Sequence, residues 1–465
     1  EGDVVALRGG LGAGKTTLAR ALIRSLAADA ALEVPSPTFT LVQTYATPRL
    51  SVAHFDLYRV ADSGELAEIG FIDAAGEGAV LVEWPERAGE ALPAERLDVT
   101  LEIAGDGRRA TIAGSDAVMR RVARSLAARA FLTASDWPAA GRCRIAGDAS
   151  ARAYERVVTP AGAAAVLMDW PASGQLPPGD PRARFRARDV SAFVAVAAAL
   201  RAIGLSAPEI FAAGIGDGFV LMEDFGEPSF LAKGAPVPAR YAVAVEALAA
   251  IHGVPRAAEL PLPDGRVHRL PLLAGDALIP EIAVFADSYA PAMRGSPLAP
   301  SARDELFAIW RDLGERLRHA GQSWVLFDVQ SANLFWLPER TGIARVGFID
   351  FQDMFHGPAA YDVAALLNDA RVTISPALQA ALLDRYVMAR TAADPAFDSA
   401  AFRIAFAVTA VLRTIKNMGA FARFAAAGNS NYVSHLPRLR AYLSTALTEP
   451  VLSPFALWYE KHVPS

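Results

Sequence analysis

The sequence is poor in cysteine and in long apolar runs. Cys143 is the single cysteine among 465 residues, which excludes an internal disulfide and a cysteine-rich metal site and suits a reducing compartment. The most apolar stretches, residues 190–205 and 402–412, are interrupted by Arg201 and Arg403. Both fall short of the roughly 20 residues that a membrane span needs. We therefore expect a cytoplasmic protein with no membrane segment and no signal peptide.

An excess of positive charge is also missing. The formal net charge is −5, which argues against a broadly basic surface for nucleic acid. We expect no direct nucleic-acid binding surface, and any role in RNA biology would be indirect.

The length predicts more than one domain, and the patterning divides the chain in two. Residues 1–115 alternate β-prone runs with one clear helix, at residues 16–28, which is typical of an α/β unit. The β-prone runs are residues 4–7, 52–55, 79–82 and 97–103. A polar, glycine-containing stretch at residues 105–115 precedes a helical segment, so we place the boundary between 115 and 116. The chain starts at Glu1, directly before the first strand, and we expect that an N-terminal piece of this domain is missing.

Residues 116–465 follow another plan. Strand-like runs at residues 163–168 and 218–222 flank one helix, at 190–203, and mostly amphipathic helix follows beyond 237. This order predicts a small β-rich lobe followed by a large helical lobe. The expected fold class is α/β: a P-loop NTPase domain, then a bilobal, protein-kinase-like α+β domain.

A phosphate-binding loop stands near the start of the chain. Residues 9–16, GGLGAGKT, match G-x-x-x-x-G-K-[ST] between an apolar strand and an amphipathic helix. Backbone N–H groups of such a glycine turn surround phosphates, the lysine neutralises them, and the threonine hydroxyl is a ligand for Mg²⁺. The residues predicted to bind ATP are Gly9, Gly12, Gly14, Lys15, Thr16 and Thr17, with Thr16 also at the metal.

Two acidic residues end neighbouring strands of this unit. Asp56 follows residues 52–55, and Glu83 follows residues 79–82. A P-loop needs a carboxylate near the metal, and either acid could bind Mg²⁺ through water or orient the attacking water. His54 lies inside an apolar strand, where a histidine is more often a core residue than a catalyst.

Three further segments make the first unit resemble a known family. PSPTFTLV (residues 35–42), HFDLYR (54–59) and VEWP (82–85) look like the motifs of the tRNA threonylcarbamoyladenosine biosynthesis ATPase TsaE, in the family's order. The resemblance implies that Thr38 acts in a switch-like loop near Mg²⁺, that Asp56 is at the metal and that Glu83 is catalytic. It also implies a protein partner, the transferase subunits of that pathway.

A second constellation lies in the helical lobe. Asp328 and Asn333 form D-x₄-N, and Asp350 follows in the apolar segment GFIDFQD (347–353). Phosphoryl transfer needs a carboxylate that accepts the proton of the attacking hydroxyl, and an amide and a second carboxylate that hold Mg²⁺ against the phosphates. We assign Asp328 to the first role, and Asn333 and Asp350 to the metal.

The remaining elements follow in the order of a kinase-like fold. GDAS (147–150) is a plausible nucleotide-covering turn, VLMED (220–224) resembles the hinge between lobes, and YDV (361–363) resembles the aspartate segment after the metal site. We expect the nucleotide to contact Ser150, Arg152, Met222 and Glu223.

Residues 120–460 resemble the aminoglycoside-phosphotransferase superfamily. The segments GDAS with Arg152 and Tyr154, VLMD (166–169), IDFQD (349–353) and KNMGAF (416–421) are most similar to the branch of the anomeric N-acetylmuramate/N-acetylglucosamine kinase of cell-wall recycling. The resemblance implies ATP-dependent phosphorylation of the anomeric hydroxyl of an amino sugar, with Asp328 as the base.

The sequence departs from the kinase pattern in two places. The chain has only four lysines, Lys15, Lys233, Lys416 and Lys461, and none is on the third strand of the small lobe, so Arg152 or Arg156 would have to replace the usual lysine. Leu326 and Phe327 stand where a basic residue often precedes the catalytic aspartate, and Gln330 stands where histidine is frequent.

Three functions are compatible with these features. The first is a bifunctional enzyme with both sites active. In the second, the kinase-like half only binds a ligand or partner. In the third, the kinase acts on another alcohol, such as an aminoglycoside or choline; aminoglycosides are polycations, so the charge of the pocket would discriminate.

Overall fold

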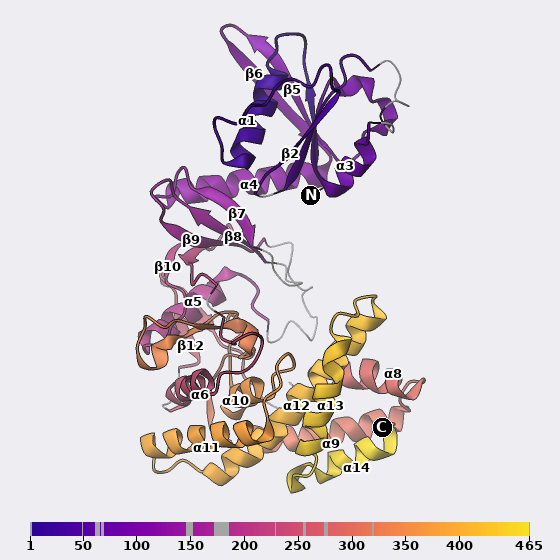
Figure 1. The fold of residues 1–465 in the computed structure, drawn as a ribbon. Helices are drawn as coiled ribbons and strands as arrows, with labels where there is room; N and C mark the ends of the chain where they lie inside the picture. Colours follow the sequence, from indigo (N-terminus) through magenta and orange to yellow (C-terminus); the bar gives the residue numbers. More distant parts are fainter. Residues whose placement is uncertain are drawn as a thin grey trace. The chain divides into compact units, whose positions relative to one another are not determined.

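The structure, a computed structural model, describes residues 2–48, 50–60, 66, 69–145, 152–171, 186–227, 229–253, 257–273, 278–318 and 320–464. It divides into two compact units, Glu1–Pro138 and Ala139–Ser465 (Figure 1). The helix α4 (Asp116–Ala134), which we expected to open the second domain, belongs to the first unit. Ser115 alone separates this helix from the preceding strand, and its hydroxyl caps the helix by accepting a hydrogen bond from Val118 N at 3.3 Å.

The first unit contains a six-stranded sheet in the order β2-β3-β4-β1-β5-β6. Its central strands β3, β4, β1 and β5 are parallel, whereas β2 and β6 pair antiparallel at the two edges. The strands are β1 (Val4–Arg8), β2 (Val42–Ala46), β3 (Ser51–Asp56), β4 (Gly78–Glu83), β5 (Leu97–Ala104) and β6 (Gly107–Gly114). The four β-prone runs predicted from the sequence are confirmed as β1, β3, β4 and β5.

Helices cover the two faces of this sheet. Along β4, Val80 and Val82 pack into one apolar cluster and Leu81 into the other, as expected for the alternation of side chains along a strand. The helix α1 (Lys15–Ala27) contributes Ile23 to the cluster of Leu81, and α3 (Phe71–Glu77) contributes Phe71 to the opposite one. Two short 3₁₀ turns, η1 (Pro85–Arg87) and η2 (Gly89–Ala91), follow β4.

The polar stretch at residues 105–115, after which we placed the domain boundary, is part of the sheet of the first unit. It forms β6, an antiparallel partner of β5 from Leu97↔Gly114 to Ala104↔Gly107. All of β6 is exposed, which explains why it has no apolar periodicity.

The second unit begins with a small β-rich lobe. Its antiparallel sheet has the order β10-β11-β9-β8-β7, and α5 (Val190–Ala202) packs against it. The strands are β7 (Gly141–Ile145), β8 (Ala153–Val158), β9 (Ala164–Asp169), β10 (Ile210–Gly214) and β11 (Phe219–Glu223). The predicted strands at 163–168 and 218–222 and the predicted helix at 190–203 are confirmed as β9, β11 and α5.

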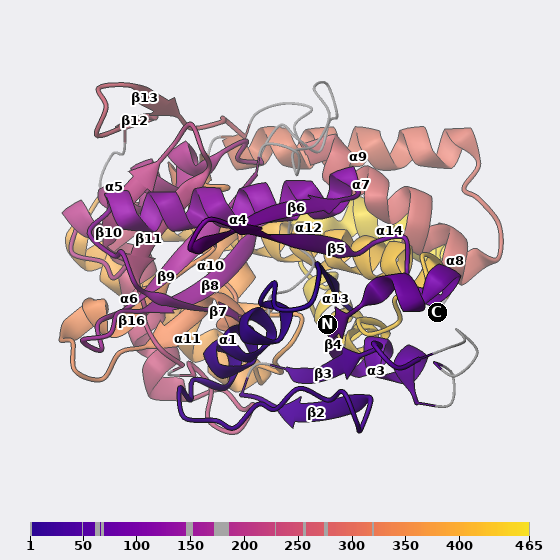
Figure 2. The ribbon, with the colours of Figure 1, turned by 90° about the horizontal axis from the view of Figure 1, so that it is seen from above.

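A helical lobe follows, shown from two directions in Figures 1 and 2. Its helices are α6 (Pro238–His252), α7 (Ile279–Val284), α8 (Ala290–Arg294), α9 (Pro300–Arg318), α10 (Ala360–Leu367), α11 (Pro376–Ala393), α12 (Ser399–Ala426), α13 (Leu436–Ala446) and α14 (Ser453–His462). A π-helical turn, η6 (Phe285–Tyr289), joins α7 to α8, and 3₁₀ turns lie at η7 (Ser331–Asn333), η8 (Gly342–Arg345), η9 (Val433–His435) and η10 (Pro450–Leu452).

Three two-stranded ladders also lie in this part of the chain. They pair β12 (Glu259–Pro261) with β13 (Val267–Arg269), β14 (Gln322–Val325) with β17 (Phe355–Pro358), and β15 (Leu334–Trp336) with β16 (Val346–Phe348). The last two ladders flank Asp328, Asn333 and Asp350, and they hold the two polar segments beside each other.

The helix α12 runs through the core of the helical lobe. Among the described residues it is the one helix whose length and composition would allow it to cross a membrane, but 72% of its most apolar window is buried inside the protein. Its role is therefore that of a core helix.

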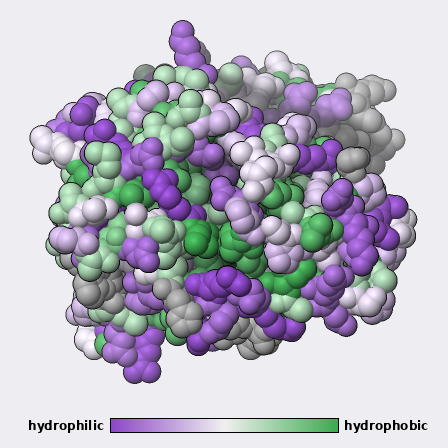
Figure 3. All heavy atoms as spheres, turned by 90° about the horizontal axis from the view of Figure 1, so that it is seen from below, coloured by the Kyte–Doolittle hydropathy of each residue, from purple (hydrophilic) through white to green (hydrophobic). Residues whose placement is uncertain are grey.

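Figure 3 shows a face on which apolar residues gather toward the middle and polar residues border them.

Candidate active sites

The P-loop lies at the carboxyl end of β1, where an open parallel sheet places its ligands. Gly9 has φ 139°, and a Cβ there would lie 2.5 Å from the Leu101 carbonyl oxygen, so only glycine fits. Gly12 and Gly14 also have positive φ, 75° and 104°. The backbone thus takes left-handed conformations at the positions where the motif has glycine.

Lys15 is almost fully buried at the start of α1. Its ammonium group donates to the carbonyl oxygens of Gly9 at 2.7 Å and Gly10 at 3.0 Å, and it lies 3.7 Å from the centroid of the Trp84 ring. Burial lowers the pKa of Lys15, although nearby carboxylates, first of all Glu83, oppose this shift. Thr17, which was also predicted to bind ATP, is exposed in the first turn of α1.

A chain of polar contacts joins the P-loop to the end of β4. The Thr16 hydroxyl donates to Glu83 Oε2 at 2.9 Å, and His54 Nε2 lies 2.9 Å from Glu83 Oε1. Glu83 and His54 are both buried, and the His54 Nδ1 atom has no hydrogen-bond partner among the described residues. His54 is a core residue, as expected, but it also orients the predicted catalytic acid.

The second acid, Asp56, ends β3 directly opposite Glu83. Its Oδ2 atom accepts from the Thr38 hydroxyl at 2.6 Å and from the Ser36 hydroxyl at 2.9 Å, while Oδ1 accepts from Tyr58 N at 3.1 Å. The structure therefore brings the S-P-T-F segment to Asp56, and the place of Thr38 and Asp56 at Mg²⁺ stays a prediction. Ser36, which we had not predicted as a site residue, belongs to the same motif.

The catalytic loop of the second unit has a strained backbone on both sides of the site. Phe327 and Asp350 have φ 78° and 60°, a region that non-glycine residues rarely adopt and that often accompanies function. The Asn333 amide donates to the Asp328 carbonyl oxygen at 2.9 Å and to Asp350 Oδ2 at 3.4 Å. The three predicted residues therefore converge on one place.

Buried aspartates beneath this loop fix its path. Asp362 of α10 accepts from the backbone N–H groups of Leu326 at 2.7 Å and Phe327 at 3.1 Å. Asp369 accepts from Ser331 N at 2.8 Å and from its hydroxyl at 2.6 Å. Buried donors left unpaired would cost free energy, so these carboxylates stabilise the strained conformation.

Three cations surround Asp328. Arg413 of α12 donates to the Phe327 carbonyl oxygen at 2.6 Å and lies 3.5 Å from Asp328 Oδ1. Burial alone would raise the pKa of the Asp328 carboxyl, but Arg413, Lys416 and Arg186 outweigh it and bring the pKa below its usual value. The predicted base is therefore an ionised carboxylate. The sequence assigned these cations no role, although Arg413 and Lys416 are three apart on one helix face.

Arg152 lies in the small lobe, and its side chain contacts Asp350, the predicted metal ligand. Its Nη2 atom donates to Asp350 Oδ1 at 2.7 Å, and the Gln352 amide donates to the same oxygen at 3.0 Å. Burial raises the pKa of Asp350, and Arg152 opposes that shift. Arg156, the other substitute for the missing lysine, pairs instead with Asp224 at 2.7 Å.

The predicted hinge lies at the end of β11. Met222 is buried there, and the Glu223 carboxylate is paired with Arg340. The Glu223 side chain therefore forms a structural ion pair with Arg340, and its contact with the nucleotide stays a prediction. Ser150 and the whole segment 147–150 lie outside the described residues.

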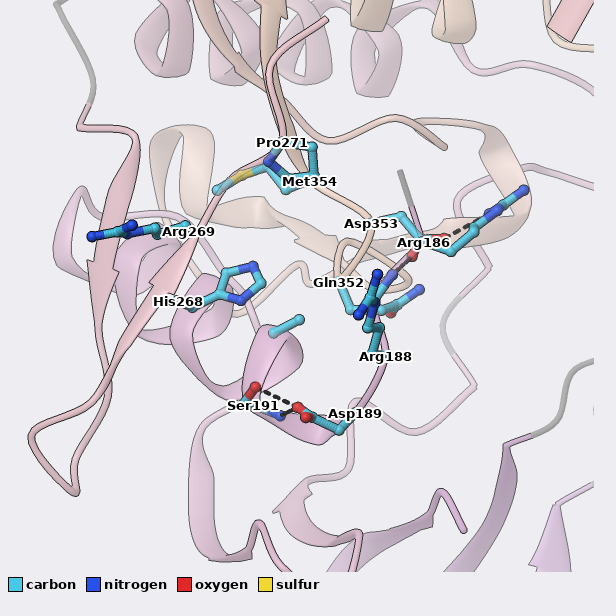
Figure 4. A pocket seen from close by; sticks show the side chains of 12 residues that line it. Arg186, Arg188, Asp189, Ser191, His268, Arg269, Pro271, Gln352, Asp353 and Met354 are labelled. Atoms are coloured by element: carbon cyan, nitrogen blue, oxygen red, sulfur yellow. Dashed lines mark hydrogen bonds and ion pairs between the residues drawn. The ribbon is translucent and has the colours of Figure 1, made fainter. Parts of the chain in front are cut away.

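A cavity of about 260 Å³ lies beside this site (Figure 4). Arg186 lines this cavity and donates to Asp353 at 2.6 Å, and Asp353 also accepts from Ala187 N at 2.7 Å. Gln352, which contacts Asp350, lines the cavity too. Asp328, Asn333 and Asp350 are not among its lining residues, so this cavity is a neighbour of the trio.

Both sites fit Mg²⁺ bound to ATP phosphates. Carboxylate, amide and hydroxyl oxygens are the ligands that Mg²⁺ prefers, and it needs only one or two from the protein. Thr16 and Asp56 with Thr38 offer such a set in the first unit, and Asn333 with Asp350 does so in the second. No cluster of three or more His, Cys, Asp or Glu occurs in the described part of the chain.

Comparison with known proteins assigns both units. Residues 1–111 match the family "Threonylcarbamoyl adenosine biosynthesis protein TsaE", and residues 142–402 match the "Phosphotransferase enzyme family". The chain belongs to both families. It joins a TsaE domain to a phosphotransferase domain of the aminoglycoside-phosphotransferase, protein-kinase-like fold, and it is an enzyme with ATPase and phosphotransferase activities. The helix α4 lies between the two matched segments.

Individual relatives agree with this division. The chain is 35% identical to an N-acetylmuramate/N-acetylglucosamine kinase of Caulobacter vibrioides, over 73% of this chain and 97% of that protein. It is 37% identical to a TsaE of Rickettsia felis over 23% of this chain and 62% of that protein. It is 38% identical to a TsaE of Treponema pallidum, over 23% of this chain and 79% of that protein. The TsaE domain thus spans less than two thirds of the length of the Rickettsia felis relative.

Proposed function

We propose that the phosphotransferase domain transfers the γ-phosphoryl group of ATP to the anomeric hydroxyl of N-acetylmuramate or N-acetylglucosamine, in cell-wall recycling. The observation that carries this proposal is the convergence of three residues: the Asp328 carboxylate lies 3.5 Å from Arg413, and the Asn333 amide donates both to the backbone carbonyl oxygen of Asp328 and to the carboxylate of Asp350. The 35% identity to a kinase named for these sugars supports the choice of substrate.

Each group of the site has a distinct task in this reaction. Asp328 accepts the proton of the sugar hydroxyl while the hydroxyl oxygen attacks the γ-phosphorus. The bond between the γ-phosphorus and the bridging oxygen of the β-phosphate then breaks, and ADP leaves. Asn333 and Asp350 would hold Mg²⁺, which supplies charge neutralisation at the phosphates. Arg152 is well placed to neutralise phosphate charge from the small lobe.

The charge around Asp328 disfavours the alternative acceptors. An aminoglycoside is a polycation and would have to approach Asp328 past Arg413, Lys416 and Arg186, of which Asp353 and Glu281 partly neutralise the last two. Choline would need an open aromatic face for its quaternary ammonium group. The Phe327 ring beside Asp328 already has Lys416 at 3.8 Å and Arg186 at 5.0 Å from its centroid.

A product assay tests this proposal. The full chain with ATP and Mg²⁺ should convert both amino sugars into 1-phosphates visible by ³¹P NMR, and it should leave choline and aminoglycosides unchanged. Asp328→Asn should abolish the product, whereas Asp304→Asn, which changes an exposed acid of α9, should not. An equal rate in the Asp328→Asn protein would refute the proposal, because phosphorylation would then need no base at that position.

We propose that the TsaE domain hydrolyses ATP in support of tRNA threonylcarbamoyladenosine formation, acting on transferase subunits rather than on RNA. Thr16, Thr38 and Asp56 would hold Mg²⁺, and Glu83 would orient the attacking water. A cytoplasmic location fits both reactions. ATP hydrolysis measured with and without those subunits tests the role, and the absence of both stimulation and complex formation would count against it.

A further inference from the structure

The segment KNMGAF at residues 416–421 has so far been given one role, the effect of Lys416 on the pKa of Asp328, and no contact with the acceptor. Its first residue, Lys416, is largely buried on α12. The Lys416 ammonium group lies 3.3 Å from Glu281 Oε2 of α7, yet it makes no hydrogen bond to any described residue. It is also 3.8 Å above the ring of Phe327, the neighbour of Asp328. A buried cation therefore stands beside the base with unused donors.

Helix packing holds Lys416 in this place. One turn farther along α12, Gly419 lies against the junction of α7 and η6, where a Cβ would be 2.6 Å from Phe285 N. Only glycine allows so close an approach of the two backbones. The π-helical turn η6 begins at that contact, and such turns are frequent at functional sites. The pairing of Lys416 with Glu281 is thus built into the lobe.

The other two cations near Asp328 are already committed. Arg413 donates to the Phe327 carbonyl oxygen at 2.6 Å, and Arg186 donates to Asp353 at 2.6 Å. Lys416 differs from both, because its one ionic partner lacks the alignment of a hydrogen bond. Of the three, it is the cation that makes no hydrogen bond to any described residue, so all of its N–H donors remain for an added acceptor.

We propose that Lys416 is the specificity residue for an acidic acceptor and binds the lactyl carboxylate of N-acetylmuramate, with Glu281 as its counter-charge when the sugar is neutral. This inference rests on the proposed sugar-kinase function. The paired carboxylate explains how one site accepts both sugars: N-acetylglucosamine leaves the ion pair intact, and N-acetylmuramate adds a second acceptor to the ammonium group. Ammonium–carboxylate hydrogen bonds are among the stronger ones in proteins.

Two substitutions should move the preference in opposite directions. Lys416→Met keeps the length of the side chain but removes the charge, and it should lower kcat/KM for N-acetylmuramate relative to N-acetylglucosamine by about tenfold or more. Lys416→Arg should restore part of the preference. Glu281→Gln removes the competing carboxylate and should shift the same ratio toward N-acetylmuramate. A purely structural role would lower both rates together.

Steady-state kinetics with both sugars, combined with calorimetric binding of each sugar to the full chain, provide the test. Opposite shifts of the ratio in Lys416→Met and Glu281→Gln support the proposal. If both sugars are phosphorylated and neither substitution changes the ratio, the role of Lys416 is wrong and the sugar-kinase function stands. If no sugar phosphate forms but N-acetylmuramate binds and Lys416→Met weakens it selectively, the kinase function fails and the subsite stands. Binding of neither sugar overturns both.

Discussion

The guanidinium group of Arg152 donates to the carboxylate of Asp350 at 2.7 Å, from the small lobe to the predicted metal ligand. The third strand of this lobe, β9, has no lysine. Arg152 precedes β8, the strand next to β9 in the sheet. We propose that its guanidinium group takes the place of the missing lysine at the phosphates.

Replacement of Arg152 should therefore impair nucleotide use. We expect Arg152→Ala to raise KM for ATP by about tenfold or more, because a charge-assisted contact to phosphate is lost. Arg152→Lys should be intermediate, since an ammonium group cannot form a planar fork. Initial rates at varied ATP measure this. The matched control is Arg156→Ala, whose guanidinium pairs with Asp224; a larger effect there than at Arg152 would reverse the assignment.

In the TsaE domain, Glu83 should be needed for hydrolysis but not for binding. Glu83→Gln keeps the shape of the side chain yet loses the charge that faces Thr16 and His54, and we expect ATP hydrolysis to fall by about 100-fold. Binding of a fluorescent ATP analogue should change little. Unchanged hydrolysis would show that another group orients the water.

Asp362 should be required for the stability of the catalytic loop. Asp362→Ala leaves the backbone N–H groups of Leu326 and Phe327 buried without their acceptor, and we expect a loss of about 2–5 kcal/mol in the free energy of unfolding of the phosphotransferase domain. Urea denaturation followed by tryptophan fluorescence measures it. A variant as stable as the wild type would mean that the loop has other support.

The charge of Asp328 should make stability depend on pH. Its folded-state pKa is lowered, so the carboxylate contributes stability above its unfolded pKa, and this contribution is lost as the pH falls through the folded pKa. Asp328→Asn should therefore be less stable than the wild type at pH 7, with the difference shrinking below about pH 4. Thermal melts across this range check the sign. A difference that grows on acidification would contradict the lowered pKa.

Much of the fold could be predicted because local patterns and spacing decide it. The P-loop and its flanking strand and helix follow from glycine geometry and apolar periodicity, and β9 and β11 follow from their short apolar runs. The strand β6 could not be predicted in this way, because all of it is exposed and only its pairing with β5 defines it. The compact units divide after α4 rather than before it, and no sequence pattern marks this point, because α4 starts directly after β6.

The sites divide in a similar way. Asp328, Asn333 and Asp350 could be named from motif spacing, and the structure brings them together. The contacts of Arg152, Arg186 and Arg413 depend on segments distant in sequence, up to 198 residues apart for Arg152 and Asp350, so no local pattern reveals them. Lys416 was part of a recognised segment, but its relation to Glu281 appears only when α12 packs against α7.

The central claim is that one chain carries two separate nucleotide sites. Sugar-dependent phosphorylation and sugar-independent ATP hydrolysis should be measured in the same preparations of the full chain, Lys15→Ala and Asp328→Asn. We expect that Lys15→Ala loses only the hydrolysis and Asp328→Asn loses only the phosphorylation. Loss of both activities in either variant, or full sugar phosphorylation by Asp328→Asn, would contradict it.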